Sequence, residues 1–271
     1  MLLATTSAAE PALHRGDDSG ALHWQTGAVR GETRGDRTVL THVVTPAVLR
    51  VERGRLRRGP GYATAPTLVR HELARTGAIL RLRERGAYVV HASGVVDHDG
   101  RAWLFIGNSG SGKSTLAFAL ARRGWRVLGD DGVVLRLAAD GALVAHGWRD
   151  PLRVSATLFG VFPELVPLAP LIDDRDERRR MPVVMPFAAR APVTACICLE
   201  CGPDDALARL PETTAMAALM VQSPWVLLGD AHSRSHFDAL RRVTSTVPCW
   251  RLVNTDRQLR DIERTIDSIR T

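Results

Sequence analysis

Lysine is almost absent from this chain of 271 residues, whose 36 lysine and arginine residues comprise one lysine, Lys113, and 35 arginines. Aromatic residues make up only 5% of the sequence, which leaves few side chains to stack on nucleobases. No apolar run approaches the roughly 18 residues of a membrane-spanning helix. These shortages argue against nucleic-acid binding and against a membrane-spanning protein.

Cysteine is also scarce, and three of the four cysteines form a C-x-C-x-x-C cluster of Cys196, Cys198 and Cys201. Cys196 and Cys198 lie in an apolar strand pattern, so both are expected on one face, with Cys201 in a turn just beyond. A zinc site is the alternative, but it needs a fourth ligand and a tight loop between ligands. Buried structural thiols without disulfides are the better interpretation.

The N-terminal residues MLLATTSAAE carry neither a basic segment nor a long apolar stretch, so no secretory signal is expected. With 45% hydrophobic residues, the chain is expected to be a cytoplasmic globular protein. Its formal charge is +7 and its pI is about 10.2. Because the arginines are spread along the chain, this excess indicates an anionic nucleotide or an acidic peptide as the partner, rather than nucleic acid.

The single lysine lies in a match to the phosphate-binding pattern G-x-x-x-x-G-K-[ST]. Glycines let successive N–H groups point inward as an anion nest, and the following helix adds its positive end. Lys113 is expected to reach the β- and γ-phosphates, and the Ser114 hydroxyl to hold Mg²⁺. The residues expected to bind nucleotide are Gly107, Asn108, Ser109, Gly110, Ser111, Gly112, Lys113, Ser114 and Thr115.

The surroundings of this loop fit the motif. Residues 103–106 are an apolar run that predicts a buried strand, and residues 113–123 have the spacing of a helix that stops at Gly124. The alternative is a glycine-rich turn that binds nothing, and the flanking strand and helix favour the phosphate loop.

Two adjacent carboxylates, Asp130 and Asp131, follow a strand predicted over 126–128. Ligands of α/β sheets bind at the carboxyl ends of strands, so both carboxylates are expected beside the phosphate loop. One can hold Mg²⁺ while the other accepts a proton from an attacking hydroxyl. A plain acidic turn before Gly132 is the alternative.

Alternating strands and helices after Ala87 predict an α/β fold, with a central mixed sheet flanked by helices and a small β-rich unit before it. We expect residues 1–20 to be disordered, 21–86 to form the β-rich unit with one helix, and 87–271 to form the catalytic domain. Predicted helices and strands that bear on the site are helices 67–83, 213–221, 233–244 and 256–269, and strands 193–200 and 247–252.

Together, His91-Ala92-Ser93, the string GNSGSGKST, residues 123–131 (RGWRVLGDD) and residues 247–252 (VPCWRL) resemble the catalytic core of HPr kinase/phosphorylase and its relatives. These relatives include kinases encoded beside ribosomally made peptides, among them lasso peptide tailoring kinases. The resemblance covers roughly Ala87 to the C-terminus. It implies a P-loop kinase core similar to HPr kinase and phosphoenolpyruvate carboxykinase, with ATP and Mg²⁺ as cofactors.

The resemblance also implies roles for single residues. Asp131 matches the aspartate that acts as general base on the substrate serine, Asp130 its metal-side neighbour, and His91 an active-site histidine; packing at a strand end is the alternative for His91. The acidic residue of a later glycine-rich signature has no match in residues 146–153 (HGWRDPLR), which puts the metal shell and phosphorolysis in doubt. Arginine can stabilise a transferring phosphoryl group. Candidates for this are Arg153, Arg178, Arg179 and Arg180.

The sequence therefore predicts a kinase that transfers the γ-phosphate of ATP to a serine-type hydroxyl of a protein or peptide, with a lasso-type precursor peptide as one acceptor to consider. A small-molecule kinase is the first alternative, but more than a third of this chain precedes the loop, and its aspartates are adjacent rather than spaced as Asp-x-Asp. The second is a nucleotide-dependent regulatory module, which would need no general base. Homo-oligomerisation stays open.

Overall fold

The computed structural model describes residues 12–14, 21–148, 153–154, 162, 179–180, 185–203, 206–255 and 262–270. The chain divides into two compact units. Unit 1 comprises Met1–Val89 together with Pro224–Asp238, and unit 2 comprises Val90–Ser223 together with Ala239–Thr271. The later segment joins the N-terminal unit, although the sequence pattern gives no sign of this.

Unit 1 is built on a six-stranded antiparallel sheet in which the strands follow one another in chain order. Each strand pairs with its successor, as expected of a meander. The strands are β1 (Ala12–His14), β2 (Leu22–Thr26), β3 (Val29–Arg34), β4 (Arg37–His42), β5 (Val48–Glu52) and β6 (Arg55–Arg58). The β-rich unit expected from the sequence is therefore present, and β1 falls within the segment expected to be disordered; most of that segment lies outside the described residues.

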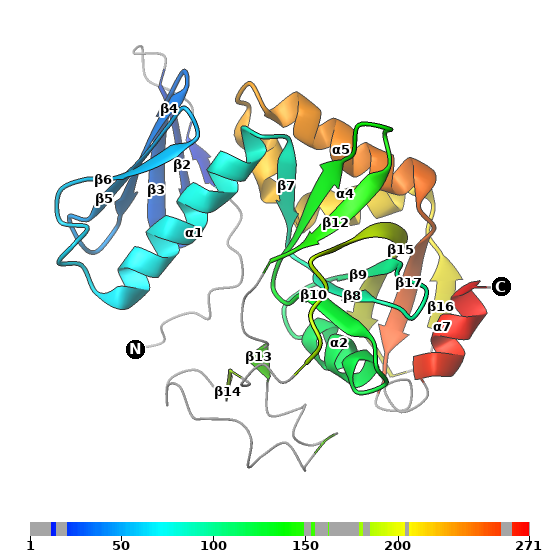
Figure 1. The fold of residues 1–271 in the computed structure, drawn as a ribbon. Coiled ribbons are helices and arrows are strands. Elements are labelled where there is room, and N and C mark those ends of the chain that lie inside the picture. The colour runs from blue at the N-terminus through cyan, green and yellow to red at the C-terminus, as the bar shows by residue number, and fades with distance from the viewer. Residues whose placement is uncertain are drawn as a thin grey trace. The chain divides into compact units, whose positions relative to one another are not determined.

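One helix, α1 (Thr67–Arg83), lies along this sheet (Figure 1). Its bounds are those predicted from the sequence. Leu49 and Val51 of β5 are buried, whereas the residues between and beside them are half-buried, so one face of the sheet forms the core beneath α1. Gly77 lets the helix approach closely, because a Cβ there would lie 2.9 Å from side-chain atoms of Leu49 and Leu56.

The segment that returns to unit 1 is held by a buried ion pair. A 3₁₀ helix (Pro224–Leu228) precedes Asp230, whose two carboxylate oxygens accept hydrogen bonds from Arg83 at 2.6 and 2.9 Å. The Arg83 side chain is 1% exposed. Burial raises the pKa of Asp230, but the Arg83 guanidinium outweighs it, and the net pKa is lowered. The rings of Trp24 and Trp225 meet edge to face, with their centroids 5.5 Å apart.

Acid should destabilise unit 1 through His236, a fully buried residue that stacks on Tyr88 with ring centroids 4.5 Å apart. Burial, aided by the nearby charge of Arg83, lowers the pKa of His236 from 6.5 to about 3. Between these values the unfolded chain binds a proton that the folded chain does not. The free energy of unfolding should therefore fall as the pH drops below 6.5, by up to about 1.4 kcal/mol per pH unit.

The measurement is denaturant unfolding of wild type and His236→Phe between pH 6.5 and pH 4.5, above the range in which carboxylates dominate. Phenylalanine keeps a ring against Tyr88 but cannot titrate. The wild-type free energy should decline more steeply than that of the variant. Burial also lowers the pKa of His146, but that group titrates in both proteins and cancels in the comparison. Equal slopes would show that His236 is not the acid-sensitive group.

Unit 2 is built on a nine-stranded mixed sheet in the order β10-β8-β9-β15-β12-β11-β7, with β17 paired to β15 and β16 to β17. The long strand β15 (Arg190–Cys201) joins the two halves: its beginning pairs with β12, and its end pairs in parallel with β9 and β17. The other strands are β7 (Ala87–Val90), β8 (Ser93–Val96), β9 (Ala102–Ile106), β10 (Arg126–Gly129), β11 (Val133–Leu137), β12 (Leu143–Gly147), β16 (Ala206–Arg209) and β17 (Cys249–Asn254).

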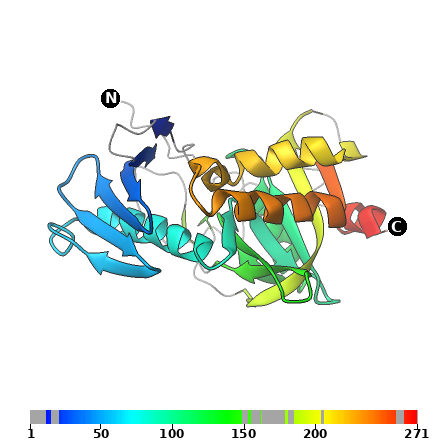
Figure 2. The same ribbon diagram turned by 90° about the horizontal axis from the view of Figure 1, so that it is seen from above.

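Helices cover both faces of this sheet (Figures 1 and 2). On one face, α2 (Lys113–Ala121) and α7 (Ile262–Arg270) enclose an apolar core with Trp103, Phe105 and Ile197. On the other lie α4 (Glu212–Val221) and, beside it, α5 (Ser233–Thr246). β7 and β9 are buried on both faces, which explains their continuous apolar sequences.

The mixed α/β architecture predicted from the sequence is confirmed, as are the helices and strands named above, with shifts of one to a few residues at their ends. The last helix begins at Ile262 in the described residues, so the first part of its predicted range lies outside them. In the described part of the chain, no helix is long and apolar enough to cross a membrane.

Candidate functional site

Three strand ends place the predicted residues at one edge of the unit 2 sheet. β8 pairs antiparallel with both β9 and β10, so β9 and β10 run in the same direction. The loop after β9 and the turn after β10 therefore emerge at the same edge, and β8 begins there between them. Topology thus brings the phosphate-loop motif, the aspartate pair and the start of β8 together.

The loop between β9 and α2 has the backbone that its glycines allow. Gly107, Gly110 and Gly112 have φ values of 148°, 86° and 90°, a region that residues with a Cβ rarely adopt. A Cβ at Gly107 would lie 2.4 Å from the carbonyl oxygen of Leu199 on β15, so a larger residue cannot fit. No side chain caps the N-terminus of α2 at Gly112, and the N-terminus of a helix attracts anions.

The Lys113 side chain folds back over this loop. Its Nζ donates hydrogen bonds to the carbonyl oxygens of Gly107 at 2.7 Å and Asn108 at 3.0 Å, and the residue is 7% exposed. The ammonium group is thereby held above the turn that the glycines shape. This places the only lysine of the sequence where a point charge can meet phosphate oxygens.

Asp130 is joined to the loop through the Ser114 hydroxyl. Ser114 Oγ donates to Asp130 Oδ1 at 2.8 Å, and Ser93 Oγ donates to the same oxygen at 2.5 Å. Asp130 is 2% exposed and Ser93 is fully buried. Sequence reasoning assigned no role to Ser93, although a lone hydroxyl in the buried strand β8 was a signal, because buried hydroxyls need a hydrogen-bond partner.

Asp131 faces a different partner because the backbone turns sharply at this residue. Its φ is 64°, and only one other non-glycine residue in the described ranges has a positive φ. Gly129 makes the turn tight, since a Cβ there would lie 2.3 Å from the carbonyl oxygen of Gly132. Aspartate tolerates the left-handed region better than most residues, so the turn separates two adjacent carboxylates at modest cost.

His91 lies beside Asp131. Its Nδ1 is 3.1 Å from Asp131 Oδ1, and the two side chains are 20% and 24% exposed. The His91 backbone is fixed between β7 and β8 by a hydrogen bond from its N–H to the carbonyl of Gln222 at 2.7 Å. Packing at a strand end, the alternative considered for His91, does not by itself account for this contact with Asp131. The structure instead brings His91 together with Asp131.

The donor set at the buried carboxylate fits a magnesium ion. Mg²⁺ prefers hard oxygen ligands and binds through few protein groups together with phosphate oxygens. Ser114 Oγ and the Asp130 carboxylate are such ligands and already lie within hydrogen-bonding distance of each other. Among the residues that the structure describes, no group of three or more histidine, cysteine or acidic side chains could hold a metal without such help.

The arginine candidates are only partly described. Arg153 lies in β13 (Arg153–Val154) and is the register partner of Arg180 in β14 (Arg179–Arg180). β13 lies against α2, the helix that begins with Lys113. The side chains of these residues, and the whole of Arg178, lie outside the described residues. Trp148, which belongs to the segment 146–153 discussed above, lies against Gly129 and Gly132 of the aspartate turn.

The cysteine prediction needs a correction. Cys196 and Cys249 are buried neighbours on β15 and β17, and a hydrogen bond between them, together with burial, raises the pKa of Cys196. Cys198 is half-buried and Cys201 is exposed, so not all three clustered thiols are buried. β15 continues to Cys201, which brings its Sγ to 3.5 Å from the carbonyl oxygen of Gly110 in the loop.

No protein-family model matches this chain, and no curated protein matches it. Among solved structures, the Hpr(Ser) kinase/phosphatase from Coxiella burnetii is similar to it, with a TM-score of 0.35 and 14% sequence identity. That alignment covers 67% of this chain and 95% of the other.

Proposed function

We propose that this chain is an ATP- and Mg²⁺-dependent kinase that transfers the γ-phosphate to a serine-type hydroxyl of a protein or peptide. One observation carries the proposal. At the edge where the phosphate loop begins, the two adjacent carboxylates have separate partners: Asp130 is bound to Ser114, and Asp131 to His91. A metal-side carboxylate and a more exposed basic carboxylate are the two acidic groups that hydroxyl phosphorylation requires.

In this proposal the loop and Lys113 would neutralise the phosphates, and Ser114 and Asp130 would hold the Mg²⁺, which would offset phosphate charge during transfer. Asp131 accepts the proton of the acceptor hydroxyl while the oxygen of that hydroxyl forms a bond to the γ-phosphorus. The bond from that phosphorus to the bridging oxygen breaks, and ADP leaves with the electron pair. His91 is a positioning residue that orients the Asp131 carboxylate.

The protein or peptide acceptor is supported by the residues shared with HPr kinase relatives, and by the presence of an N-terminal β-rich unit that contains none of the phosphate-loop residues. Asp131 supports catalysis over a purely regulatory use of ATP, because a switch needs no base for an external hydroxyl. The contact between Asp131 and His91 adds to this, since it gives the carboxylate a fixed direction.

The test is incubation with γ-labelled ATP and Mg²⁺, with peptides encoded by neighbouring genes and a pool of hydroxyl metabolites offered as acceptors, read by mass spectrometry. We expect one phosphate on a serine of a peptide, and none when that serine is alanine. Transfer only to a metabolite would replace the proposal with a small-molecule kinase. ATP binding without transfer to either class would favour a regulatory module.

A further inference from the structure

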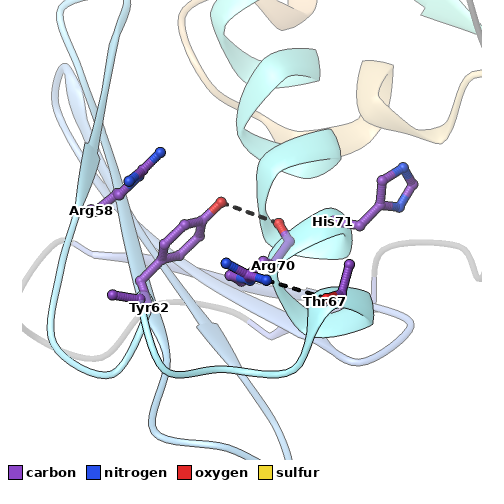
Figure 3. A pocket seen from close by; sticks show the side chains of 6 residues that line it. Arg58, Tyr62, Thr67, Arg70 and His71 are labelled. Carbon is purple, nitrogen blue, oxygen red and sulfur yellow. Dashed lines mark hydrogen bonds between the residues drawn. The ribbon is translucent and has the colours of Figure 1, made fainter.

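A basic cavity lies in unit 1, within the N-terminal sheet and helix. It has a volume of about 390 Å³ and is lined by Arg58, Tyr62, Ala63, Thr67, Arg70 and His71 (Figure 3). That volume is within the range of small-ligand sites. No carboxylate lines it. We propose that this cavity docks an acidic side chain of the peptide or protein that the kinase phosphorylates.

The cations of this cavity have no acidic partner in the described part of the chain. No ion pair joins Arg58, Arg70 or His71 to any described carboxylate, whereas the neighbouring Glu72 is engaged by His42 at 3.0 Å. Arg70 Nε is shielded from solvent and meets no acceptor among the described residues. An uncompensated buried donor of this kind gains most from an anionic acceptor.

Internal contacts hold the cavity in shape. Arg70 donates a side-chain hydrogen bond to Thr67 Oγ1 at 3.2 Å, and Tyr62 donates its hydroxyl to the Arg70 carbonyl at 3.3 Å (Figure 3). The Arg58 guanidinium lies 5.7 Å from the centre of the Tyr62 ring. The two arginines are thus presented from β6 and α1 on either side of a ring, which is an arrangement suited to a carboxylate. The first turn of α1 has no acidic residue to oppose that anion.

An extended peptide fits this place better than a free anion because the cavity adjoins an edge strand. β6 is the last strand of its sheet, all four of its residues are exposed, and no described strand pairs with its outer side. Backbone groups along such an edge can accept an added strand. β6 carries no carboxylate that would repel an acidic strand added at this edge.

The sheet geometry supplies a matched control on the same strand. Leu56 of β6 contacts α1, so Arg58, two residues further on, faces the cavity side of the sheet. Arg55 and Arg57 face the other side. Reversing the charge of Arg55 and Arg57 changes the net charge by the same amount as reversing Arg58 and Arg70, but it leaves the cavity intact.

The experiment measures fluorescence anisotropy of a labelled peptide of alternating Glu and Thr residues, added to the full chain without ATP. We expect Arg58→Glu/Arg70→Glu to bind it at least about tenfold more weakly than wild type. The control Arg55→Glu/Arg57→Glu should change the affinity less than about twofold at physiological salt. If the reversed variant fails to fold, Arg58→Gln/Arg70→Gln makes the same comparison with a smaller loss.

Three outcomes would overturn the docking site: no binding of the acidic peptide to wild type, equal loss in the control, or equal binding of a Gln–Thr peptide. Complete displacement by millimolar inorganic phosphate would show a simple anion site instead. The substrate part of the inference rests on the proposed kinase function. Because the binding assay needs no turnover, failure of the separate transfer assay with γ-labelled ATP would refute the kinase and leave the docking site standing.

Discussion

Replacing Lys113 with alanine is expected to abolish detectable phosphoryl transfer and to weaken ATP binding sharply. The ammonium group is held by the carbonyls of Gly107 and Asn108, over the turn that the loop glycines shape. Loss of one preorganised group at a transferring phosphoryl costs about 10²–10³ in rate. Titration with a fluorescent ATP analogue and the mass-spectrometric transfer assay measure the two effects separately.

Lys113→Arg is the matched control, because it keeps the charge and changes only its shape. We expect it to restore little activity, since the planar guanidinium is too wide for a site that holds the lysine at 7% exposure. A Lys113→Met variant tests the fold, as it keeps the length of the side chain without the charge. ATP affinity and transfer in Lys113→Ala within about tenfold of wild type would contradict the assignment of the loop as the nucleotide site.

Asp131→Asn should remove transfer while leaving ATP binding nearly unchanged. Asparagine has the same size and also tolerates the left-handed backbone that Asp131 adopts, with a φ of 64°, so the turn should persist. What is lost is the basic carboxylate, and general-base catalysis contributes typically about 10²–10⁴ in rate. The measurement is the single-turnover rate with saturating ATP and peptide.

Asp130→Asn separates the two carboxylates. The substitution weakens the proposed pair of Mg²⁺ ligands, which are Ser114 Oγ and the Asp130 carboxylate. The loss of phosphoryl transfer should therefore depend on the Mg²⁺ concentration and be partly relieved by excess Mg²⁺. The defect of Asp131→Asn should not respond to Mg²⁺. Alanine is a poorer choice at position 131, because it would add backbone strain to the loss of the carboxylate. If Asp131→Asn retains transfer, the base lies elsewhere; if both variants respond alike to Mg²⁺, the two roles are not divided as proposed.

The sequence predicts a phosphate loop because the pattern is local. Three glycines, a lysine and a serine at fixed spacing specify a backbone turn and its ligands without reference to the rest of the chain. Helices and strands with a regular pattern of apolar residues were predictable for the same reason. The periodicity of residues 67–83 and the apolar run at 103–106 reflect contacts within a helix or with the faces of a sheet, and both features appear as α1 and β9.

Other features depend on contacts that are distant in sequence. The partnership of Ser93 with Asp130 arises because β8 starts between the ends of β9 and β10, which no local pattern encodes. Cys201 was predicted to be buried but is exposed, and the reason is the same. Its exposure depends on where β15 ends, at the loop, rather than on the alternation within the strand.

By itself, the sequence determined the identity and order of the candidate groups: one lysine in a phosphate-loop motif, two adjacent carboxylates and a histidine before a strand. Only the tertiary structure decided how the carboxylates divide, because that depends on a left-handed turn at Asp131 and on partners from other strands. The same holds for the basic cavity of unit 1, whose arginines come from β6 and α1 and meet only when helix and sheet pack together. Short-range patterns specify chemistry, whereas the direction in which a side chain points is set by long-range packing.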